Sequence, residues 1–274
     1  MSKPFFSVVI PTLNEEKFLP NLLESLTRQT CRDFEVTVVD GTSHDKTVKI
    51  AKSFRKQLPR LRILVSKKAS LPLQRNLGAR DSKGKWLCFI DADSILLPYF
   101  FERVGEHIAR YQPQLLTTWF RPDSENSKDS VFTLLGNIVV EGSLIFKKPM
   151  SPGPLTLVRR DIFRQVDGYD EQHAYHEDVD FGIRLAKIGV YLNVLRESLY
   201  VWSLRRFRKE GTLKVLNQYI ISILPVLLIN KSLKFMPGYI MGGHLYHQKA
   251  RRVKRSVLRV YEKKLRRLVK EFFE

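Results

Sequence analysis

Short, β-branched apolar segments that end in polar or acidic residues alternate along this chain with segments of helical periodicity. The first four apolar segments are Ser7–Pro11, Phe34–Asp40, Arg62–Val65 and Trp86–Asp91. They predict buried strands, because they are short and are stopped by proline, glycine or carboxylates. Strands that alternate with helices at this interval favour an α/β fold with a single doubly wound, mostly parallel sheet and flanking helices.

Helices are predicted between and after these strands. Asn14-Glu15-Glu16 offers an N-cap and first-turn carboxylates, so we expect a helix to open there and to bury the leucine stripe that follows. The remaining predicted elements are the helices 47–57, 73–79, 98–111 and 177–188 and the strands 115–120 and 155–158. Residues 121–130 are expected to form a polar loop.

Positive charge is concentrated near the carboxyl terminus. The chain has 274 residues and a formal net charge of +19. Residues 203–274 contain 18 Lys and Arg against four Glu, which gives +14, so the first 202 residues carry only +5. We therefore place a boundary at residue 203, after which a helical basic region is expected. With 43% hydrophobic residues, the composition excludes a disordered or collagen-like chain.

The expected location is the cytoplasm. The amino terminus has neither the basic region nor the long apolar region of a signal peptide. Cys31 and Cys88 are the two cysteines, and nothing in the sequence pairs them, which is typical of a reducing compartment.

Two carboxylates, Asp91 and Asp93, directly follow the strand that begins at Trp86. Residues two apart face the same side of a strand, so the strand end lets both carboxylates converge. Paired hard oxygens suit Mg²⁺ or Mn²⁺, which keep waters and bridge substrate phosphates. The competing interpretation is a solvated turn or a helix cap.

A second polar cluster, Asp40–Thr47, follows the second strand. Asp40 is predicted to contact a ligand such as a nucleobase or a ribose hydroxyl. Capping of the next helix is the favoured interpretation for Ser43, Asp45 and Thr47. Arg75, at the start of a short helix, is equally compatible with binding a diphosphate and with an ordinary surface position.

A third cluster, His176–Asp180, opens the predicted helix that contains Arg184. Three carboxylates at a helix N-terminus are favoured by the helix dipole alone. The functional alternative is that one of them is a general base acting on a hydroxyl acceptor. The spacing by itself does not decide between the two.

Taken together, these motifs resemble those of the family 2 glycosyltransferases, which have the GT-A fold. The similarity extends in order over about residues 6–206. The five matching motifs are Val8–Glu16, Asp40–Thr47 (similar to Asp-x-x-Ser-x-Asp-x-Thr), Arg75–Gly78 (Arg-Asn-x-Gly), Asp91–Asp93 (Asp-x-Asp), and an acceptor-side motif made of Gly168–Asp170 followed by Glu177-Asp178. Five motifs in register are a specific signal, although each one alone is modest.

The resemblance implies a division of labour within a catalytic domain over residues 1–202. A nucleotide-sugar half, about residues 1–95, holds the nucleoside through Pro11, Glu15 and Asp40, with Arg75 nearby. An acceptor half covers about residues 96–202. The implied donor is a UDP- or GDP-sugar.

The resemblance also implies the chemistry. Asp91 contacts the ribose or a metal-bound water, and Asp91 and Asp93 are the metal ligands for Mg²⁺ or Mn²⁺. Asp178 is the base that deprotonates the acceptor hydroxyl, and Glu177 lies beside it as a substrate-binding residue. Displacement in one step then transfers one sugar with inversion at the anomeric carbon.

Two departures from the family pattern are visible. Many relatives have a late histidine as a further metal ligand, but no histidine occurs here between His176 and His244. We expect Arg205, Arg206 and Arg208 to offset diphosphate charge instead, with Arg206 as a substrate-binding residue. The chain also lacks the Gln-x-x-Arg-Trp motif of processive synthases, which favours transfer of a single sugar.

Two carboxyl-terminal segments raise the question of a membrane. Residues 215–230 have no charge, but 16 residues span about 24 Å as a helix, less than the ~30 Å hydrocarbon core. Residues 251–274 predict a basic amphipathic helix, which either lies on an anionic membrane surface or docks on the protein. Because acceptors in the resembling family are often lipid-linked, a peripheral position on the inner face of the cell membrane is favoured.

The leading hypothesis is therefore a metal-dependent, inverting glycosyltransferase that acts on a hydroxyl acceptor, either lipid-linked or a polysaccharide or glycolipid precursor. One alternative is a nucleotidyltransferase acting on a sugar phosphate, although residues 12–17 lack the glycines that a phosphate loop needs. The other is a non-catalytic basic scaffold for anionic lipid or RNA. Nucleic-acid binding is not expected, because no known reader motif is present.

Overall fold

The sheet predicted from the alternating pattern is present as an eight-stranded mixed sheet. The structure, a computed structural model, describes residues 3–145, 151–173, 175–212, 214–215, 217–219 and 232–234. The strand order is β3-β2-β1-β4-β7-β6-β8-β5. The strands are β1 (Phe6–Thr12), β2 (Phe34–Asp40), β3 (Leu61–Val65), β4 (Trp86–Ile90), β5 (Ile95–Leu96), β6 (Leu115–Pro122), β7 (Leu155–Arg159) and β8 (Leu192–Trp202).

The predicted fold class is confirmed, and the sheet divides into two parts of different pairing. β1, β2, β3 and β4 pair in parallel, as do β6 and β8. β7 pairs antiparallel with both β4 and β6, and β5 pairs antiparallel with β8. β1, β2 and β4 are buried along their whole length, as expected of a parallel sheet covered on both faces, whereas β3, at the edge of the sheet, is mostly half-buried.

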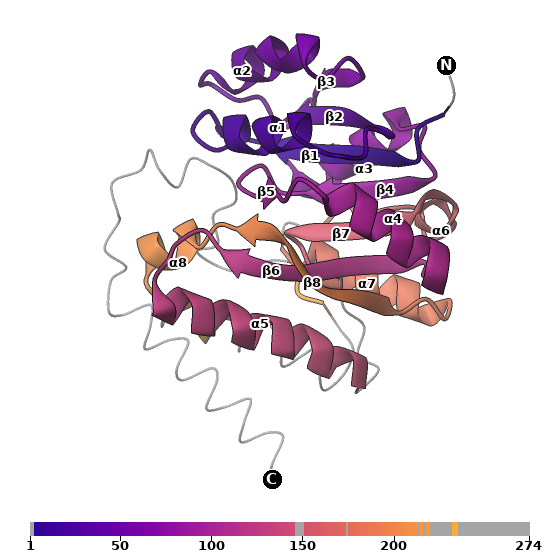
Figure 1. Cartoon of the computed structure of the whole chain (residues 1–274), viewed down its shortest axis with the longest axis vertical. Helices are drawn as coiled ribbons and strands as arrows, with labels where there is room; N and C mark the ends of the chain where they lie inside the picture. Colours follow the sequence, from indigo (N-terminus) through magenta and orange to yellow (C-terminus); the bar gives the residue numbers. More distant parts are fainter. Residues whose placement is uncertain are drawn as a thin grey trace.

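Helices cover both faces of this sheet (Figure 1). The helices are α1 (Leu19–Thr27), α2 (Thr47–Ser53), the 3-10 turn η1 (Phe54–Lys56), α3 (Leu71–Asp81), α4 (Phe100–Tyr111), α5 (Ser127–Ile145), α6 (Arg160–Gln165), α7 (Glu177–Lys187) and α8 (Arg205–Glu210). α1 and α4 share one hydrophobic core with Val8 and Ile10 of β1. α3, α6 and α7 share the other core with Val9, because successive strand residues face opposite sides.

The strand register brings the polar strand ends to one edge. Thr12 of β1 is paired with Asp40 of β2, and β4 runs parallel beside β1. The antiparallel pairing of β4 with β7 places the loop before β7 beside the end of β4, where the backbone N–H of Asp91 donates to the carbonyl of Pro154 at 3.1 Å. This edge is where ligands bind in open α/β sheets.

Two predicted boundaries are wrong. The first helix begins at Leu19 rather than at Asn14, because Asn14 has a left-handed backbone (φ 56°) and Pro20 occupies the first helical turn. Residues 121–130 are not all loop, since α5 starts at Ser127, and the sequence pattern did not reveal this helix. α5 packs Val140 and Leu144 on the core but leaves Leu134, Leu135 and Ile138 exposed.

Most of the carboxyl-terminal segments lie outside the described residues. This applies to the predicted amphipathic helix over 251–274 and to nearly all of the apolar segment 215–230. Within the part that is described, none of the helices combines the length and apolar character needed to cross a bilayer.

Candidate active site

A cavity of about 510 Å³ opens where β1 and β4 end. Eight of the nine side chains that the sequence singles out line its walls: Pro11, Glu15, Arg75, Asp91, Asp93, Glu177, Asp178 and Arg206. The ninth, Asp40, does not. The cavity therefore brings together residues that are separated by up to almost 200 positions in the chain.

Asp91 and Asp93 sit in the turn after β4, and both reach the cavity. The Asp93 side chain is 10% exposed, and that of Asp91 is 33% exposed. Withdrawal from water is the main cause that raises the pKa of both carboxyls, that of Asp93 to about 7. Both carboxyls therefore lie in the wall of one cavity at the end of β4, and their joint use as metal ligands stays a prediction.

Arg205, the first residue of α8, holds two of the carboxyl groups. Its Nη1 and Nη2 donate to the two carboxylate oxygens of Glu15 at 2.6 and 2.7 Å, and its Nε lies 2.7 Å from Oδ2 of Asp93. The guanidinium carbon also lies 4.6 Å from the centre of the Phe18 ring. Arg205 is therefore a counter-charge for one carboxylate of the Asp-x-Asp pair.

The neighbouring arginines of α8 differ from Arg205. Arg206 lines the cavity and forms an ion pair with Glu210 at 3.1 Å. Arg208 forms an ion pair with Asp123 at 2.5 Å and is not part of the cavity wall. Of the three arginines expected to offset diphosphate charge, two are placed at the cavity.

Arg75 makes the corresponding contacts on the other side of the cavity. Its Nη1 donates to Oε1 of Glu177 at 3.0 Å, and its Nη2 donates to Oδ1 of Asp91 at 3.2 Å and to the carbonyl of Gly153 at 2.8 Å. The side chain is almost fully buried and lies over the Tyr169 ring. Arg75 is thus no surface residue, and it ties the Asp-x-Asp turn to the start of α7.

Glu177 and Asp178 form the first turn of α7, where the helix dipole favours carboxylates. Burial raises the pKa of both, that of Glu177 to about 7. Oδ1 of Asp178 accepts a hydrogen bond from the backbone N–H of Val179 at 2.8 Å. Gly153 lies against Asp178, since a Cβ at residue 153 would be 2.7 Å from Oδ2.

The charge of this cavity fits a divalent cation. Five carboxyl groups line it, and two guanidinium groups, those of Arg75 and Arg205, pair with four of them. The excess of carboxyls and their raised pKa values both show that a further positive charge is favourable here. Among the described residues, no third carboxylate, imidazole or thiol completes a tight ligand cluster with Asp91 and Asp93. Mg²⁺ sites commonly use one or two carboxylates with waters and phosphates, so two ligands suffice.

Asp40 is engaged in the loop that follows β2. Its Oδ1 accepts hydrogen bonds from the hydroxyls of Thr12 (3.1 Å) and Ser43 (2.5 Å), and its Oδ2 accepts from the backbone N–H of Ser43 at 2.8 Å. Asp45 accepts from the backbone N–H of Thr47 at 2.9 Å and from that of Glu16 at 3.1 Å. The residue before α2 is Lys46, whose side chain makes no capping bond, so capping of α2 by this cluster is not confirmed; contact of Asp40 with a base stays a prediction.

The same loop explains why Asn14 does not start a helix. The Asn14 side chain accepts from the backbone N–H of His44 at 2.8 Å, and its own N–H donates to the Ser43 hydroxyl at 2.8 Å. The backbone N–H of Glu15 donates to the Thr47 hydroxyl at 2.8 Å. These bonds fasten the loop after β1 to the loop after β2 and set Glu15 in the cavity wall.

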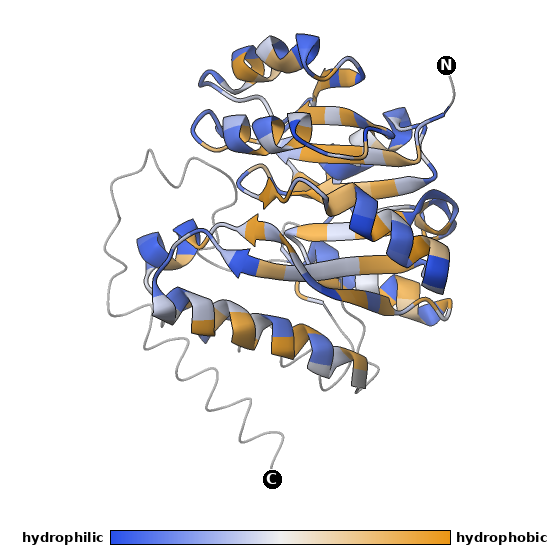
Figure 2. Ribbon diagram, in the orientation of Figure 1, coloured by the Kyte–Doolittle hydropathy of each residue, from blue (hydrophilic) through white to orange (hydrophobic). Residues whose placement is uncertain are grey.

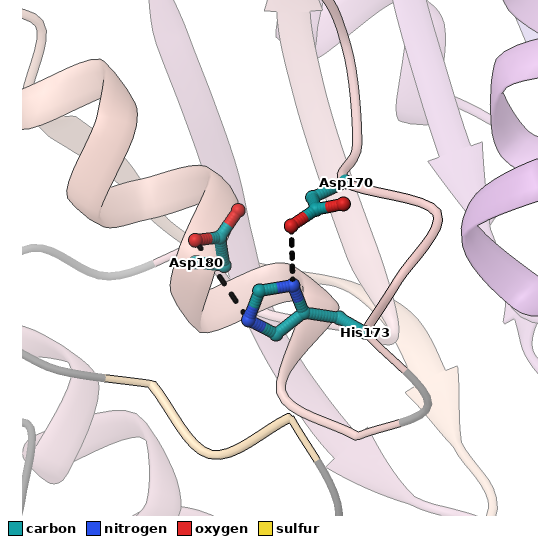
Figure 3. Close-up of side chains that lie close together, drawn as sticks. All are labelled: Asp170, His173 and Asp180. Carbon is teal, nitrogen blue, oxygen red and sulfur yellow. Dashed lines mark hydrogen bonds and ion pairs between the residues drawn. The ribbon is translucent and has the colours of Figure 1, made fainter.

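A second cluster of titratable side chains lies beside the cavity (Figure 3). Among the described residues, Asp170, His173 and Asp180 are the group whose ligand atoms are close enough to share a metal ion. His173 Nδ1 lies 3.0 Å from Asp170, and Nε2 lies 3.0 Å from the Ser232 hydroxyl and 3.9 Å from Asp180. Both ring nitrogens therefore have protein partners, and the cluster fastens the loop before α7 to residues 232–234.

Several cavity residues were not found from the sequence. Gln74 donates from Nε2 to the carbonyls of Thr12 (2.8 Å) and Val39 (2.7 Å), which joins the ends of β1 and β2. Trp202 and Tyr219 add aromatic surface to the wall, and burial raises the pKa of Tyr219 to about 12. Gln74 directly precedes Arg75 in its motif, which was the available signal. Tyr219 falls in a segment that was interpreted only as apolar.

Comparison with known proteins matches the amino-terminal part of the chain to a single family. Residues 7–167 match the family model described as Glycosyl transferase family 2. The PGL/p-HBAD biosynthesis glycosyltransferase of Mycobacterium bovis (strain BCG / Pasteur 1173P2) is 32% identical over 187 residues, which are 67% of this chain and 70% of that protein. The glycosyltransferase EpsJ of Bacillus subtilis is 25% identical over 214 residues, and the chain spans only 61% of its length.

Solved structures share the fold. TarS 1–349 of S. aureus in complex with UDP aligns with a TM-score of 0.60 and 23% identity, covering 74% of this chain and 61% of that one. A mannosyltransferase, PcManGT from Pyrobaculum calidifontis in complex with GDP-Man and Mn²⁺, aligns with a TM-score of 0.62 and 18% identity, covering 83% and 69%. At these identities the likeness concerns the fold.

Proposed function

Since this chain belongs to glycosyl transferase family 2, we propose that its cavity transfers one sugar from a nucleotide-sugar donor to a hydroxyl acceptor with inversion of configuration. The observation that carries this proposal is the placement of two carboxylate pairs in one cavity. Asp91 and Asp93 end β4, and Glu177 and Asp178 begin α7. One pair serves the departing diphosphate and the other serves the acceptor.

The donor half of the cavity is assigned to the parallel part of the sheet. Pro11, Glu15 and Arg75 line the cavity and are proposed to contact the nucleotide. Asp40 accepts a hydrogen bond from the backbone of the loop that follows β2. The fold neighbours that were solved with UDP and GDP-Man support a UDP- or GDP-sugar as donor. Asp93, with Asp91, would hold Mg²⁺ or Mn²⁺, which when bound neutralises charge on the diphosphate leaving group.

Asp178 is proposed as the general base. Its burial raises its pKa above the usual value for an aspartate, which makes the carboxylate a stronger proton acceptor. It takes the proton of the acceptor hydroxyl as that oxygen attacks the anomeric carbon. Arg75 pairs with the adjacent Glu177, so it holds the start of α7 in place relative to the Asp-x-Asp turn.

Arg205 is proposed to act as an internal counter-cation. In the donor-free protein it neutralises Asp93 and Glu15. Asp93 would hold a divalent cation through the same carboxylate that pairs with the Arg205 Nε. Arg205, together with Arg206, is then available to a diphosphate oxygen, because a guanidinium binds phosphate and carboxylate with the same geometry.

The acceptor and the cellular position are also proposals. A lipid-linked hydroxyl acceptor fits the basic region over residues 203–274, and the protein would then lie peripherally on the inner face of the membrane. The division into a catalytic domain, residues 1–202, and a basic extension, residues 203–274, is also a proposal, with α8 of the extension contributing Arg205 and Arg206 to the cavity wall.

Thermal shift with nucleoside diphosphates tests the assignment of the donor. The protein is melted with UDP, GDP, ADP or CDP, each with and without Mn²⁺. We expect one of the uridine or guanosine compounds to raise Tm in the presence of Mn²⁺ and much less in its absence. Equal shifts from all four diphosphates, or none from any, would contradict a specific nucleotide-sugar site.

A further inference from the structure

α5 presents its apolar side to the outside of the molecule. Val131, Leu134, Leu135, Ile138 and Val139 are each 51–57% exposed. Their spacing of three and four residues places them on one side of the helix, which we call the α5 aliphatic face. Gly142 continues this spacing by one more step, and nothing lies within 4 Å of where its Cβ would be.

The side of α5 that faces the sheet is mixed: Val140 and Leu144 pack against the core, and polar residues beside them are buried. Asn137 is 4% exposed and exchanges two hydrogen bonds with the backbone of Phe120, at 2.9 and 3.2 Å. Glu141, one turn further on, accepts from the indole N–H of Trp119 at 3.1 Å. Thr133, one turn earlier, is 2% exposed. Turning the helix to bury its aliphatic face would break these buried hydrogen bonds, so the outward orientation is fixed.

The helix that carries the α5 aliphatic face also contacts the wall of the active-site cavity, through Phe132. α5 runs along the outer side of the molecule beside β6, and apolar residues are visible along it (Figures 1 and 2). Its first turns pack on α8, where the rings of Phe132 and Phe207 are 4.5 Å apart. Phe207 and the preceding Arg206 both line the cavity. A surface that touches α5 is therefore one helix away from the place where an acceptor must enter.

Charge decides what kind of partner covers this face. A second copy of the chain would bring a further net charge of +19 into contact, which opposes self-association. An anionic surface is instead attracted by the same charge. In the sequence, Lys147 and Lys148 come two and three residues after the end of α5. An exposed aliphatic helix face on a strongly basic protein is suited to an anionic membrane interface.

We propose that the α5 aliphatic face inserts into the interface of an anionic membrane and holds the cavity next to the lipid surface. The purpose of this contact rests on the proposed function, because a lipid-linked acceptor would reach the cavity from that surface. The contact itself rests on the exposure, orientation and charge described above. It is separate from the predicted helix over residues 251–274.

Vesicle binding of the full-length protein tests this surface. The protein is sedimented with vesicles of phosphatidylcholine, with and without phosphatidylglycerol. The wild type should bind the anionic vesicles, and Leu134→Gln/Ile138→Gln should weaken that binding roughly tenfold or more. The matched control is Val65→Gln/Tyr111→Gln, which changes two residues that are 61% and 56% exposed elsewhere and should bind like the wild type.

A spectroscopic variant places the contact on α5 even where the double variant is poorly folded. Leu135→Trp should show a shift of its added emission to shorter wavelength with anionic vesicles, whereas Val65→Trp should not. Unchanged binding by the double variant, or no shift for Leu135→Trp, overturns the proposal. So does a wild-type dimer in sedimentation equilibrium that the double variant converts to monomer, since another copy would then cover the face.

The two proposals fail separately. Loss of vesicle binding with an unchanged diphosphate-induced rise in Tm supports the surface and leaves the donor site intact. A protein that binds vesicles through α5 but shows no response to any nucleoside diphosphate would contradict the proposed function alone.

Discussion

At the scale of single residues, two arginines form ion pairs with four of the five carboxyl groups that line the cavity. Arg75 is buried and pairs with both Asp91 and Glu177. Arg205, on the other side of the cavity, pairs with both Glu15 and Asp93. Arg75 has a further backbone partner in Gly153 and holds the cavity together. Arg205 lies beside the proposed metal and diphosphate positions, so its ion pairs are expected to change during turnover.

Asp93→Asn is expected to lower kcat/KM by roughly a hundredfold or more while Tm stays within a few degrees of the wild type. The amide keeps the size of the side chain but removes the charge that a cation needs. Initial rates over a range of Mn²⁺ concentrations, together with a melting curve, check this result. Wild-type rates with the metal requirement retained would show that Asp93 is not a metal ligand.

Asp178→Asn is expected to reduce transfer by roughly 10²–10⁴-fold with the affinity for the donor preserved, because a base acts on the nucleophile. Calorimetric titration with the donor is run beside the transfer assay. Asp180→Asn is the matched control: Asp180 is on the same helix but pairs with Arg184 at 2.7 Å and does not line the cavity. Its loss should affect Tm more than kcat. If folded Asp178→Asn no longer binds the donor, the base belongs elsewhere.

Arg205→Gln is expected to increase the affinity for Mn²⁺ in the absence of nucleotide and to weaken the binding of UDP or GDP, several-fold in each case. Removing the guanidinium leaves Asp93 and Glu15 without their paired charge. Free Mn²⁺ is measured by electron paramagnetic resonance and nucleotide binding by calorimetry. Arg206→Gln is the control, because it removes the same charge from the same cavity wall. Equal effects of the two variants would show that the net charge of the cavity matters and not the direct pairing of Arg205 with Asp93 and Glu15.

At the scale of elements, close contact between α3 and the sheet positions Arg75. A Cβ at Gly78 would lie 2.3 Å from Cγ1 of Val9 and 3.1 Å from Cγ2 of Val39. Only a residue without a side chain lets α3 approach β1 and β2 at this distance. The glycine that the Arg-Asn-x-Gly motif contains thus has a packing role, one turn after the arginine.

Gly78→Ala is accordingly expected to destabilise the protein by about 1–3 kcal/mol, because the added methyl group overpacks the core. The control is Gly105→Ala in α4, where nothing lies within 4 Å of the added atom. An alanine in that helix interior should stabilise by about 0.5–1 kcal/mol. Denaturant titration measures both, and a neutral Gly78→Ala would show that α3 moves without cost.

At the scale of the whole molecule, burial of carboxyl groups in the cavity makes the stability of the folded state depend on pH. Burial raises the pKa of Asp93 and of Glu177 to about 7, above the values of about 4 expected in the unfolded chain. Between these values the folded state binds more protons than the unfolded state. The contribution of these groups to stability is therefore complete below about pH 4 and is lost as the pH rises through 7.

We therefore expect the Tm of the donor-free protein to fall between about pH 5 and pH 8, and Mn²⁺ to raise Tm more at the upper end, where the carboxyls are ionised. Melting curves across this range check the sign. The slope should be shallower in Asp93→Asn. A Tm that rises steadily from pH 5 to 8 without metal would show that these carboxyls are ionised in the folded state.

Local pattern was sufficient to predict much of this molecule. The observed strands over residues 34–40 and 86–90 and the helix that starts at Glu177 agree closely with those predicted. Their signals, an apolar run in each strand and acidic residues in the first helical turn, are local in the sequence. The motif order also placed eight of the nine site residues in one cavity. The helix proposed at Asn14 failed because its cap residues bond to a loop about 30 positions away.

What only the tertiary structure decided depends on contacts between distant segments. The pairing of Arg205 with Glu15 spans 190 residues and that of Arg75 with Glu177 spans 102, and neither leaves a mark in local spacing. The orientation of α5 depends on such contacts too: its aliphatic residues have helical spacing, but the bonds of Asn137 to β6 turn Val131, Leu134, Leu135, Ile138 and Val139 outward. The sequence by itself determined the strands, the motifs and the excess of charge. The fold determined which charges meet, because ion pairs and buried hydrogen bonds form only between groups that the sheet order brings within a few ångströms.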